Sequence, residues 1–355
     1  MNAVAGGGRP TSTAIEFRNV DILFGRPADC TRALGLLDAG ADRARLSAEA
    51  NVVLGVSNAS LAVREGEISV LMGLSGSGKS TLLRAANRLN QPIRGQVLIR
   101  DGDATVDVAK CAPDALRRIR RTRVAMVFQQ FGLLPWRTVR ENVGLGLELQ
   151  GMSAAERRDR VDDKLALVGL SDWAERYASE LSGGMQQRVG LARAFATDAS
   201  ILLMDEPFSA LDPLIRTKLQ DELLDLQARL KKTILFVSHD LDEAMKLGDH
   251  ISIMDGGRIV QTGTAEDIIL HPANDLIRAF VMHMNPLTAL TGAMAMRPSD
   301  GHGGGEAMDC DQPLSEVCAR LAVAGGAITL TRGGVPVGQC DASDVVRALS
   351  ARTQG

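Results

Sequence analysis

The fold of this chain can be worked out from Gly73-Leu-Ser-Gly-Ser-Gly-Lys-Ser-Thr81, nine residues that fit the pattern G-x-x-x-x-G-K-[ST]. The apolar run Ile68–Met72 comes just before them, and the helix-compatible run Leu82–Leu89 comes just after. A strand, a tight glycine-rich loop and a helix in this order are the context of a phosphate-binding loop. Its glycines let backbone N–H groups approach phosphate oxygens, and the start of the helix adds partial positive charge. The sequence therefore predicts a site for the phosphates of a nucleotide.

Two side chains of this loop carry the expected chemistry. Lys79 can reach the β- and γ-phosphates, and the hydroxyl of Ser80 can bind Mg²⁺. We expect the whole loop to contact the nucleotide, namely Gly73, Leu74, Ser75, Gly76, Ser77, Gly78, Lys79, Ser80 and Thr81.

Such a site also needs a carboxylate at the end of a buried strand to hold Mg²⁺. The apolar run Ile201–Met204 has the character of that strand, and Asp205 and Glu206 follow it directly. We predict that Asp205 contacts the metal and that Glu206 polarises the attacking water. Two acidic residues after a strand can also be a simple polar end, but their position downstream of a phosphate-binding loop favours the functional interpretation.

Composition limits the classes of partner. The 355 residues suggest about two domains. A net charge of −3 and an aromatic content of 3% argue against nucleic acid as a partner, because nucleic-acid-binding domains are basic and often stack bases on aromatic rings. The five cysteines form no Cys-x-x-Cys pair, so we expect reduced thiols. Residues 1–10 lack the apolar core of a signal peptide, and no run of about 18 apolar residues could span a bilayer. We expect a cytoplasmic protein, unless another chain holds it at a membrane.

Strand-like and helical segments alternate along the chain. Apolar runs typical of strands are found at residues 15–20, 52–63, 68–72, 95–100, 124–128, 201–204, 233–237 and 250–254. Residues from about 131 to 197 have a helical character, with Ser153–Glu156 as a candidate capping box. Asp212 and Pro213 are typical of a helix start. This alternation predicts an α/β fold with a largely parallel core sheet.

A second motif narrows the class of nucleotide-binding protein. Leu181-Ser-Gly-Gly-Met-Gln186 resembles the signature sequence of ATP-binding-cassette (ABC) ATPases. Other positions then match the pattern of that family. Gln129 matches the Q-loop, Ser209-Ala-Leu-Asp212 the D-loop, His239 the switch histidine and Phe24 the aromatic residue that stacks on adenine.

The resemblance covers about residues 14–285. It implies an ABC-type P-loop ATPase with a RecA-like core sheet, an antiparallel β subdomain and a helical subdomain at about 131–197. In this family two ATP molecules lie between two head-to-tail subunits, and each touches the phosphate loop of one subunit and the signature loop of the other. The implied cofactors are ATP and Mg²⁺, and the implied assembly is a homodimer. Three sets of residues take on implied roles: Glu206, His239 and Gln129 in catalysis; Ser80, Gln129 and Asp205 at the metal; and Phe24, Ser182, Gly183, Gly184 and Asp212 at the nucleotide, beside the phosphate loop.

Several stretches resemble one branch of the family, the ATPase subunits of quaternary-amine importers. They are Gly73–Gly76, Phe131–Val139, Leu211–Arg216 and Ser238–Met245. The resemblance implies that the chain energises import of glycine betaine, proline betaine or choline, peripherally bound to the cytoplasmic face of the inner membrane. An insertion from Phe24 to about Leu54 is similar to the choline members of this branch. Integral permease subunits and, indirectly, an extracytoplasmic substrate-binding protein are the implied partners.

The apolar stretch after Gln129 suggests where a permease docks. In ABC ATPases this region receives a short helix of the membrane subunit, so we expect Phe131, Leu133, Leu134 and Trp136 to lie at the docking groove. Alternatively, these side chains pack the core of the helical subdomain.

The remaining parts of the chain complete the expected domain organisation: a flexible tail at 1–13, the ATPase domain at 14–285, a linker at 286–311 and a small α+β module at 312–355. The module faintly resembles a single cystathionine-synthase-type regulatory motif, and a small dimerisation domain is an equal alternative. The irregular spacing of Cys310, Cys318 and Cys340 argues against a metal site there.

Two other functions are compatible with part of the pattern. A non-transport ABC ATPase of translation or DNA repair usually carries two cassettes, a long coiled coil or a zinc insertion, whereas this chain has one signature motif. A regulatory protein that only binds ATP would lack part of the catalytic set, whereas Glu206 and His239 are both present.

Overall fold

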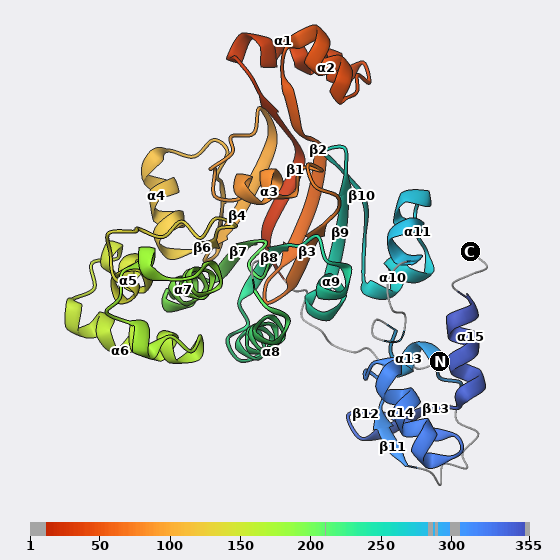
Figure 1. The fold of residues 1–355 in the computed structure, drawn as a ribbon. Helices are drawn as coiled ribbons and strands as arrows, with labels where there is room; N and C mark the ends of the chain where they lie inside the picture. Colours follow the sequence, from red (N-terminus) through yellow and green to blue (C-terminus); the bar gives the residue numbers. More distant parts are fainter. Residues whose placement is uncertain (1–11, 210, 283–286, 288–289, 299–305, 352–355) are drawn as a thin grey trace. The chain divides into compact units, whose positions relative to one another are not determined.

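The computed structural model describes residues 12–209, 211–282, 287, 290–298 and 306–351 (Figure 1). The chain divides into two compact units. The first runs to His239 and includes Met254–Ile259, and the second comprises Asp240–Ile253 and the chain from Val260 onward. The tail expected at 1–13 lies almost wholly outside the described residues.

A six-stranded sheet forms the centre of the fold, with the strand order β10-β9-β3-β8-β7-β6. Its strands are β3 (Ile68–Met72), β6 (Val124–Val127), β7 (Ile201–Asp205), β8 (Thr233–Val237), β9 (His250–Asp255) and β10 (Arg258–Gly263). The pairs β3–β8, β8–β7 and β7–β6 are all parallel. Every residue of β3, β7 and β8 is buried, as expected for parallel strands that are covered on both faces. The largely parallel core sheet expected from the sequence is confirmed.

A second sheet is antiparallel, with the order β2-β1-β4-β5. It consists of β1 (Thr13–Phe24), β2 (Val53–Arg64), β4 (Arg94–Asp101) and β5 (Ala104–Asp107). A continuous cluster of buried apolar side chains joins this sheet to α3 (Lys79–Ala85), α4 (Pro113–Thr122) and the central strands. Helix α3 therefore lies in the core, which holds the loop before it in place.

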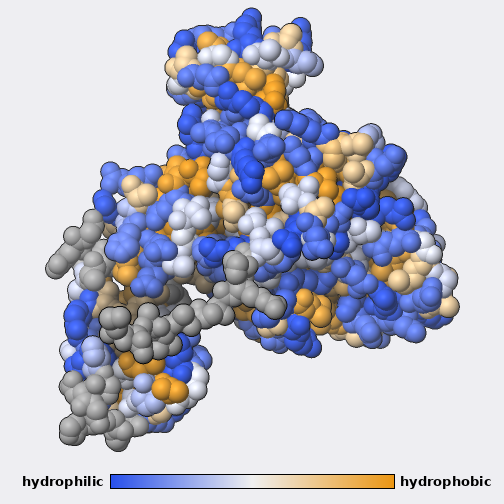
Figure 2. Space-filling model, turned by 180° about the vertical axis from the view of Figure 1, so that it is seen from behind, coloured by the Kyte–Doolittle hydropathy of each residue, from blue (hydrophilic) through white to orange (hydrophobic). Residues whose placement is uncertain are grey.

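The insertion between β1 and β2 folds as two helices, α1 (Pro27–Asp38) and α2 (Arg43–Ala50), at the far end of these long strands (Figure 1). Its apolar side chains, among them Leu37 and Leu46, form a small cluster of their own with the ends of β1 and β2. Apolar surface is visible on the insertion as well as on the body below it (Figure 2). Arg94 of β4 binds Asp38 at the end of α1, with Nη1 2.7 Å from Oδ1. The insertion is thus an ordered part of the first unit.

The helical subdomain consists of α5 (Val139–Leu149), α6 (Ala154–Leu167), the short 3₁₀ helices η1 (Ser171–Trp173) and η2 (Ala178–Glu180), and α7 (Gly183–Ala196). Both α5 and α6 begin with a complete capping box, made by Thr138 with Glu141 and by Ser153 with Glu156. The structure confirms the capping box expected at Ser153. Helix α8 (Pro213–Leu230) follows β7, with Asp212 as its N-cap as expected.

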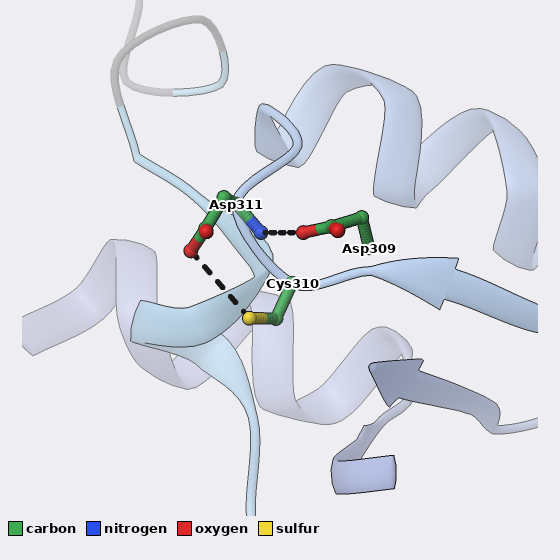
Figure 3. A group of neighbouring side chains, drawn as sticks. All are labelled: Asp309, Cys310 and Asp311. Carbon is green, nitrogen blue, oxygen red and sulfur yellow. Dashed lines mark hydrogen bonds between the residues drawn. The ribbon is translucent and has the colours of Figure 1, made fainter. Parts of the chain in front are cut away.

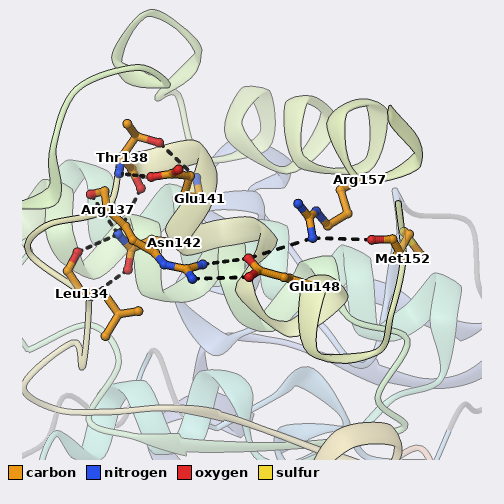
Figure 4. Close-up of polar contacts among 8 residues, drawn as sticks. All are labelled: Leu134, Arg137, Thr138, Glu141, Asn142, Glu148, Met152 and Arg157. Carbon is orange, nitrogen blue, oxygen red and sulfur yellow. Dashed lines mark hydrogen bonds and ion pairs between the residues drawn. The ribbon is translucent and has the colours of Figure 1, made fainter. Parts of the chain in front are cut away.

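A buried asparagine fixes the segment that precedes α5. The side chain of Asn142 is fully buried and bonds four backbone groups, accepting from the N–H of Leu134 and donating to the carbonyls of Leu134, Arg137 and Thr138 (Figure 4). Arg137 also pairs with Glu148 near the other end of α5. The segment from Leu134 to Thr138 therefore has a defined path although it is not a helix or a strand.

The second unit contains α9 (Leu241–Leu247), α10 (Ala265–Leu270), α11 (Asp275–Met282), α13 (Gly292–Ala295), β11 (Ala307–Asp309), α14 (Leu314–Ala324), β12 (Ile328–Arg332), β13 (Val335–Cys340) and α15 (Ala342–Ala351). Strands β11, β12 and β13 form a small sheet, which makes the C-terminal module α+β as expected.

The expected linker at 286–311 differs from the structure at both ends. Helix α13 and strand β11 lie within it, and Arg297 bonds the backbone of Gln339 in β13. Only the glycine-rich part at 299–305, together with 286 and 288–289, lies outside the described residues. Among the helices of the described residues, none is long and apolar enough to cross a membrane.

Candidate active site

The predicted catalytic residues come from the carboxyl ends of four neighbouring parallel strands. The phosphate loop follows β3, Gln129 follows β6, Asp205 ends β7 and His239 follows β8. The β7–β8 register aligns Asp205 with Val237, so Glu206 and the residues after β8 leave the sheet side by side. This edge of an open parallel sheet is where ligands are usually bound.

Two glycines of the phosphate loop permit contacts that no other residue would allow. Gly73 has a φ of 141°, and a Cβ there would lie 2.1 Å from the carbonyl oxygen of Met254. Gly78 has a φ of 105°, and a Cβ there would lie 2.4 Å from the carbonyl oxygen of Gly55. The loop therefore packs closely against the backbone at Met254 and at Gly55, and these contacts define its shape in the absence of a ligand.

Lys79 is buried under this loop. Its Nζ donates to the carbonyl oxygens of Gly73 at 2.8 Å and Leu74 at 2.9 Å. Burial lowers the pKa of the Lys79 ammonium, while the nearby carboxylates of Glu206 and Asp205 act to raise it. An ammonium has three N–H donors, so one is left for an anion in the pocket that Lys79 lines.

Ser80 and Asp205, which the sequence analysis predicts as metal ligands, are in direct contact. The Ser80 Oγ donates to Asp205 Oδ1 at 2.6 Å, and the Asp205 side chain is fully buried. Arg84 binds the other oxygen, Oδ2, with Nη2 at 2.8 Å. A hydroxyl and a carboxylate at this distance are the oxygen ligands that Mg²⁺ prefers, so the residues present fit this ion.

Glu206 is the centre of a second group. Its Oε2 accepts from Gln129 Nε2 at 3.0 Å and lies 3.4 Å from His239 Nδ1. Its backbone has a φ of 47°, which is strained for a residue with a side chain. The backbone carbonyl of Glu206 accepts from Gln187 Nε2 at 3.3 Å and Ser209 Oγ at 3.0 Å. The structure thus brings together all three predicted catalytic side chains.

Lys79, Ser80, Gln129 and Glu206 face a pocket of about 410 Å³, a size typical of sites for small ligands, whereas Asp205 and His239 do not line it. Its lining includes nine predicted residues, namely Phe24, Ser75, Gly76, Gly78, Lys79, Ser80, Thr81, Gln129 and Glu206. Phe24 is 43% exposed, which leaves its ring available for stacking. The lining also includes Arg43 of the insertion, which no sequence motif indicates.

Other predicted nucleotide contacts lie apart from this pocket. Gly73, Leu74 and Ser77 belong to the loop but are not part of the lining. Ser182 is the N-cap of α7, where its Oγ accepts from Met185 N, and Gly183 and Gly184 form the first turn. Asp212 caps α8 through the N–H of Ile215. Ser182, Gly183, Gly184 and Asp212 do not line the pocket of their own chain.

A separate groove of about 400 Å³ lies beside the Q-loop. It is lined mainly by apolar side chains of α5 and β6 and by basic ones of α4 and α7, among them Met126, Phe128, Leu145, Leu149 and Arg193. Gly132 lines it too, but Leu133, Leu134 and Trp136 do not. Trp136 is 69% exposed, so it does not pack a core either. Within the predicted docking stretch Phe131–Trp136, Gly132 is therefore the one residue that lines the groove.

One of the three cysteines of the C-terminal module, Cys310, lies between two carboxylates. Asp309, Cys310 and Asp311 lie close together (Figure 3), but Asp311 pairs with Arg332 at 3.1 Å. Burial raises the pKa of the Cys310 thiol, and it raises that of Cys340 to about 11, whereas a metal binds the thiolate.

Comparisons with known proteins agree with this geometry. The family model for ABC transporters matches residues 56–209. The glycine betaine/carnitine transport ATP-binding protein GbuA of Listeria monocytogenes is 49% identical over 282 residues, which cover 79% of this chain and 70% of GbuA. This chain belongs to the ABC transporter family. A solved dimeric bacterial ABC transporter cassette, MJ0796, is 32% identical with a TM-score of 0.60, and the match covers 70% of this chain and 98% of the cassette.

A further relative of this ABC transporter chain is the glycine betaine/proline betaine transport system ATP-binding protein ProV of Escherichia coli strain K12. It is 53% identical over 266 residues, which cover 75% of this chain. The matched region spans 65% of the length of ProV. The MJ0796 cassette has also been solved as a dimer in a post-hydrolysis state with bound ADP and phosphate.

Two arginines of the site, Arg84 and Arg43, were not predicted from the sequence. Arg84 could have been found, because it lies four residues after Ser80 and so on the same face of α3. Arg43 carries no such signal, since it is 30 positions before Gly73 in a segment without a motif.

Proposed function

We propose that this chain is the ATP-hydrolysing subunit of a transporter that imports a quaternary amine of the glycine betaine type. The observation that carries the proposal is the arrangement of Glu206 between Gln129 and His239, next to the pocket that Lys79 lines. A protein that only binds nucleotide would have no need of this polar group.

In this proposal the phosphate loop binds the triphosphate of ATP, with the ammonium of Lys79 as the cation and the ring of Phe24 stacked on adenine. Glu206 orients and polarises the attacking water, while Gln129 and His239 hold its carboxylate in place. Ser80, Asp205 and Gln129 would hold Mg²⁺, which when bound neutralises charge that develops on the phosphates. The short distance between Ser80 and Asp205 supports this assignment.

We further propose that two copies of the chain act together. Ser182 is exposed at the start of α7 and does not line the pocket of its own chain. Backbone N–H groups at the start of a helix attract anions, so Ser182, Gly183 and Gly184 are suited to the ATP of a second subunit. The dimeric MJ0796 cassette supports this arrangement.

The proposed membrane partner is a permease that docks in the groove beside the Q-loop, with this subunit at the cytoplasmic face of the inner membrane. Apolar side chains such as Leu145 and Leu149, with Arg193 at the same groove, suit a short amphipathic helix. The position of the groove next to Gln129 would connect docking to the catalytic group. An extracytoplasmic receptor would present the amine to the permease.

The solute is proposed from the relatives named above, whose names include glycine betaine, proline betaine and carnitine. Choline stays a prediction from the insertion between β1 and β2. The C-terminal module stays a candidate regulatory or dimerisation domain.

Uptake of labelled solute tests the function. Cells from which the gene has been deleted should lose ATP-dependent uptake of glycine betaine or choline, and the wild-type chain should restore it. The Glu206→Gln variant should be produced at the same level without restoring uptake. Normal uptake in the deletion strain, or copurification of the chain with ribosomes or DNA instead of a membrane protein, would contradict the proposal.

A further inference from the structure

The insertion between β1 and β2 places a cation at the phosphate loop. Arg43 is the first residue of α2, and its Nη1 donates to the carbonyl oxygen of Gly76 at 2.9 Å. Gly76 lies in the middle of the loop and lines the pocket, as Arg43 does. A residue that precedes the loop by 30 positions thus touches it directly.

The insertion holds Arg43 in this place from both sides. Asp42 caps α2 by accepting from the N–H of Arg45, and the Leu46 side chain is fully buried in the cluster of the insertion. The pairing of Asp38 with Arg94 fixes the end of α1 on β4. Arg43 is therefore presented by a folded hairpin and not by a loose loop.

The guanidinium of Arg43 has donors to spare. Its Nε is buried and has no hydrogen-bond partner among the described residues. An unpaired buried donor costs free energy, which a bound acceptor would recover. Arginine offers five N–H donors in a planar fork that suits phosphate oxygens, and the bond to Gly76 uses only one.

We propose that Arg43 is a nucleotide-binding residue, whose guanidinium contacts phosphate oxygens of the nucleotide held by the phosphate loop. This inference rests on the proposed ATP binding and adds the insertion to the binding site. According to this inference, the insertion supplies a second cation to the pocket that Lys79 lines. The contribution of Arg43 should increase with the number of phosphates.

Binding of AMP, ADP and ATP to the purified full chain, measured by calorimetry with Mg²⁺ for ADP and ATP, tests this role. Arg43→Met keeps the length of the side chain and removes its charge and donors, and it should weaken ATP binding about tenfold. The loss should be smaller for ADP and smallest for AMP. Arg43→Lys, which keeps the charge, should recover part of the ATP affinity.

Arg45→Met is the matched control, because Arg45 lies on the same helix and pairs with Glu49 at 2.7 Å. It should bind all three nucleotides like the wild type. Unchanged ATP affinity of Arg43→Met, or an equal loss for AMP and ATP, would overturn the inference, since the second result means that Arg43 only supports the shape of the loop. If the wild-type chain itself binds no ATP, the proposed function fails instead.

Discussion

Glu206 follows the buried strand β7 in a left-handed backbone conformation, and this geometry points its carboxylate at Gln129 and His239. Such strain costs on the order of 1–3 kcal/mol and is kept where the surrounding structure enforces it. Here the carbonyl of Glu206 is held by Gln187 and Ser209, which explains how the conformation is maintained.

If Glu206 polarises the attacking water, then Glu206→Gln should lower ATP turnover by about 10²–10⁴. ATP binding should stay intact, because the amide has nearly the shape of the carboxylate and lacks only its ability to accept a proton. Steady-state phosphate release and equilibrium ATP binding measure the two effects. Glu266→Gln, at an exposed position of α10, is the control and should hydrolyse ATP like the wild type. Full turnover in Glu206→Gln would exclude this role.

Lys79 gives a prediction about pH. Burial lowers the pKa of its ammonium below the ordinary 10.5 in the free chain, whereas a bound phosphate stabilises the charged form and raises that pKa. Between the two pKa values the free chain has fewer protons, so ATP binding should take up protons and weaken as the pH rises.

Calorimetry of ATP binding in two alkaline buffers that differ in ionisation enthalpy would measure this proton uptake. Lys79→Arg stays charged and should show no uptake. Proton uptake that is equal in wild type and Lys79→Arg would mean that another group titrates.

Site residues that belong to a local motif could be predicted from the sequence. The loop from Gly73 to Thr81 and the pair Asp205–Glu206 each belong to one strand end, so chain order alone placed them. Arg43 was not predictable, because its contact with Gly76 depends on how a folded insertion lies against a distant loop.

At the scale of the elements, the buried Asn142 ties the start of α5 to the segment before it (Figure 4). Asn142→Ala would leave the N–H of Leu134 without its side-chain acceptor. It would also remove one of the donors at each of three carbonyls, those of Leu134, Arg137 and Thr138, which keep their backbone donors. We expect the free energy of unfolding to fall by about 2–3 kcal/mol.

Urea unfolding followed by circular dichroism measures this change. Gln150→Ala is a suitable control, since the half-buried Gln150 side-chain amide has one partner, the carbonyl of Arg121, and its loss should change stability by less than about 0.5 kcal/mol. Equal stability of Asn142→Ala and wild type would show that water replaces the lost bonds.

The groove beside the Q-loop is an alternative to the predicted docking surface at Phe131, Leu133, Leu134 and Trp136. Leu149, which is 59% exposed at the end of α5, lines this groove, whereas Trp136 does not. Leu149→Glu should prevent copurification with the permease and leave ATP hydrolysis by the free chain unchanged, because a charge would enter an apolar contact. Trp136→Glu should have the smaller effect. If only Trp136→Glu abolishes assembly, the docking surface lies on the exposed segment before α5.

Most elements could be predicted because their patterns are local. The buried strands are short apolar runs, and Ser153 and Asp212 mark helix starts by capping chemistry. The groove could not be predicted, because Leu145 and Leu149 of α5 meet Phe128, which follows β6, only in the folded first unit. The prediction of a linker at 286–311 missed α13 and β11. These elements are only four and three residues long, which is too short for a periodic sequence pattern.

At the scale of the whole molecule, one chain holds only part of the proposed site. The pocket is lined by part of the phosphate loop and by Gln129 and Glu206, but Ser182, Gly183 and Gly184 do not line it. The proposed function therefore requires a second copy, which closes over ATP and separates after hydrolysis removes the γ-phosphate.

Light scattering of the Glu206→Gln chain with and without ATP and Mg²⁺ tests this requirement most directly, since slow hydrolysis should preserve the ATP-bound state. The account predicts monomers without ATP, dimers with ATP, and monomers in both conditions once Ser182→Glu is added. Saturation with ATP while the Glu206→Gln chain stays monomeric at every concentration would contradict it.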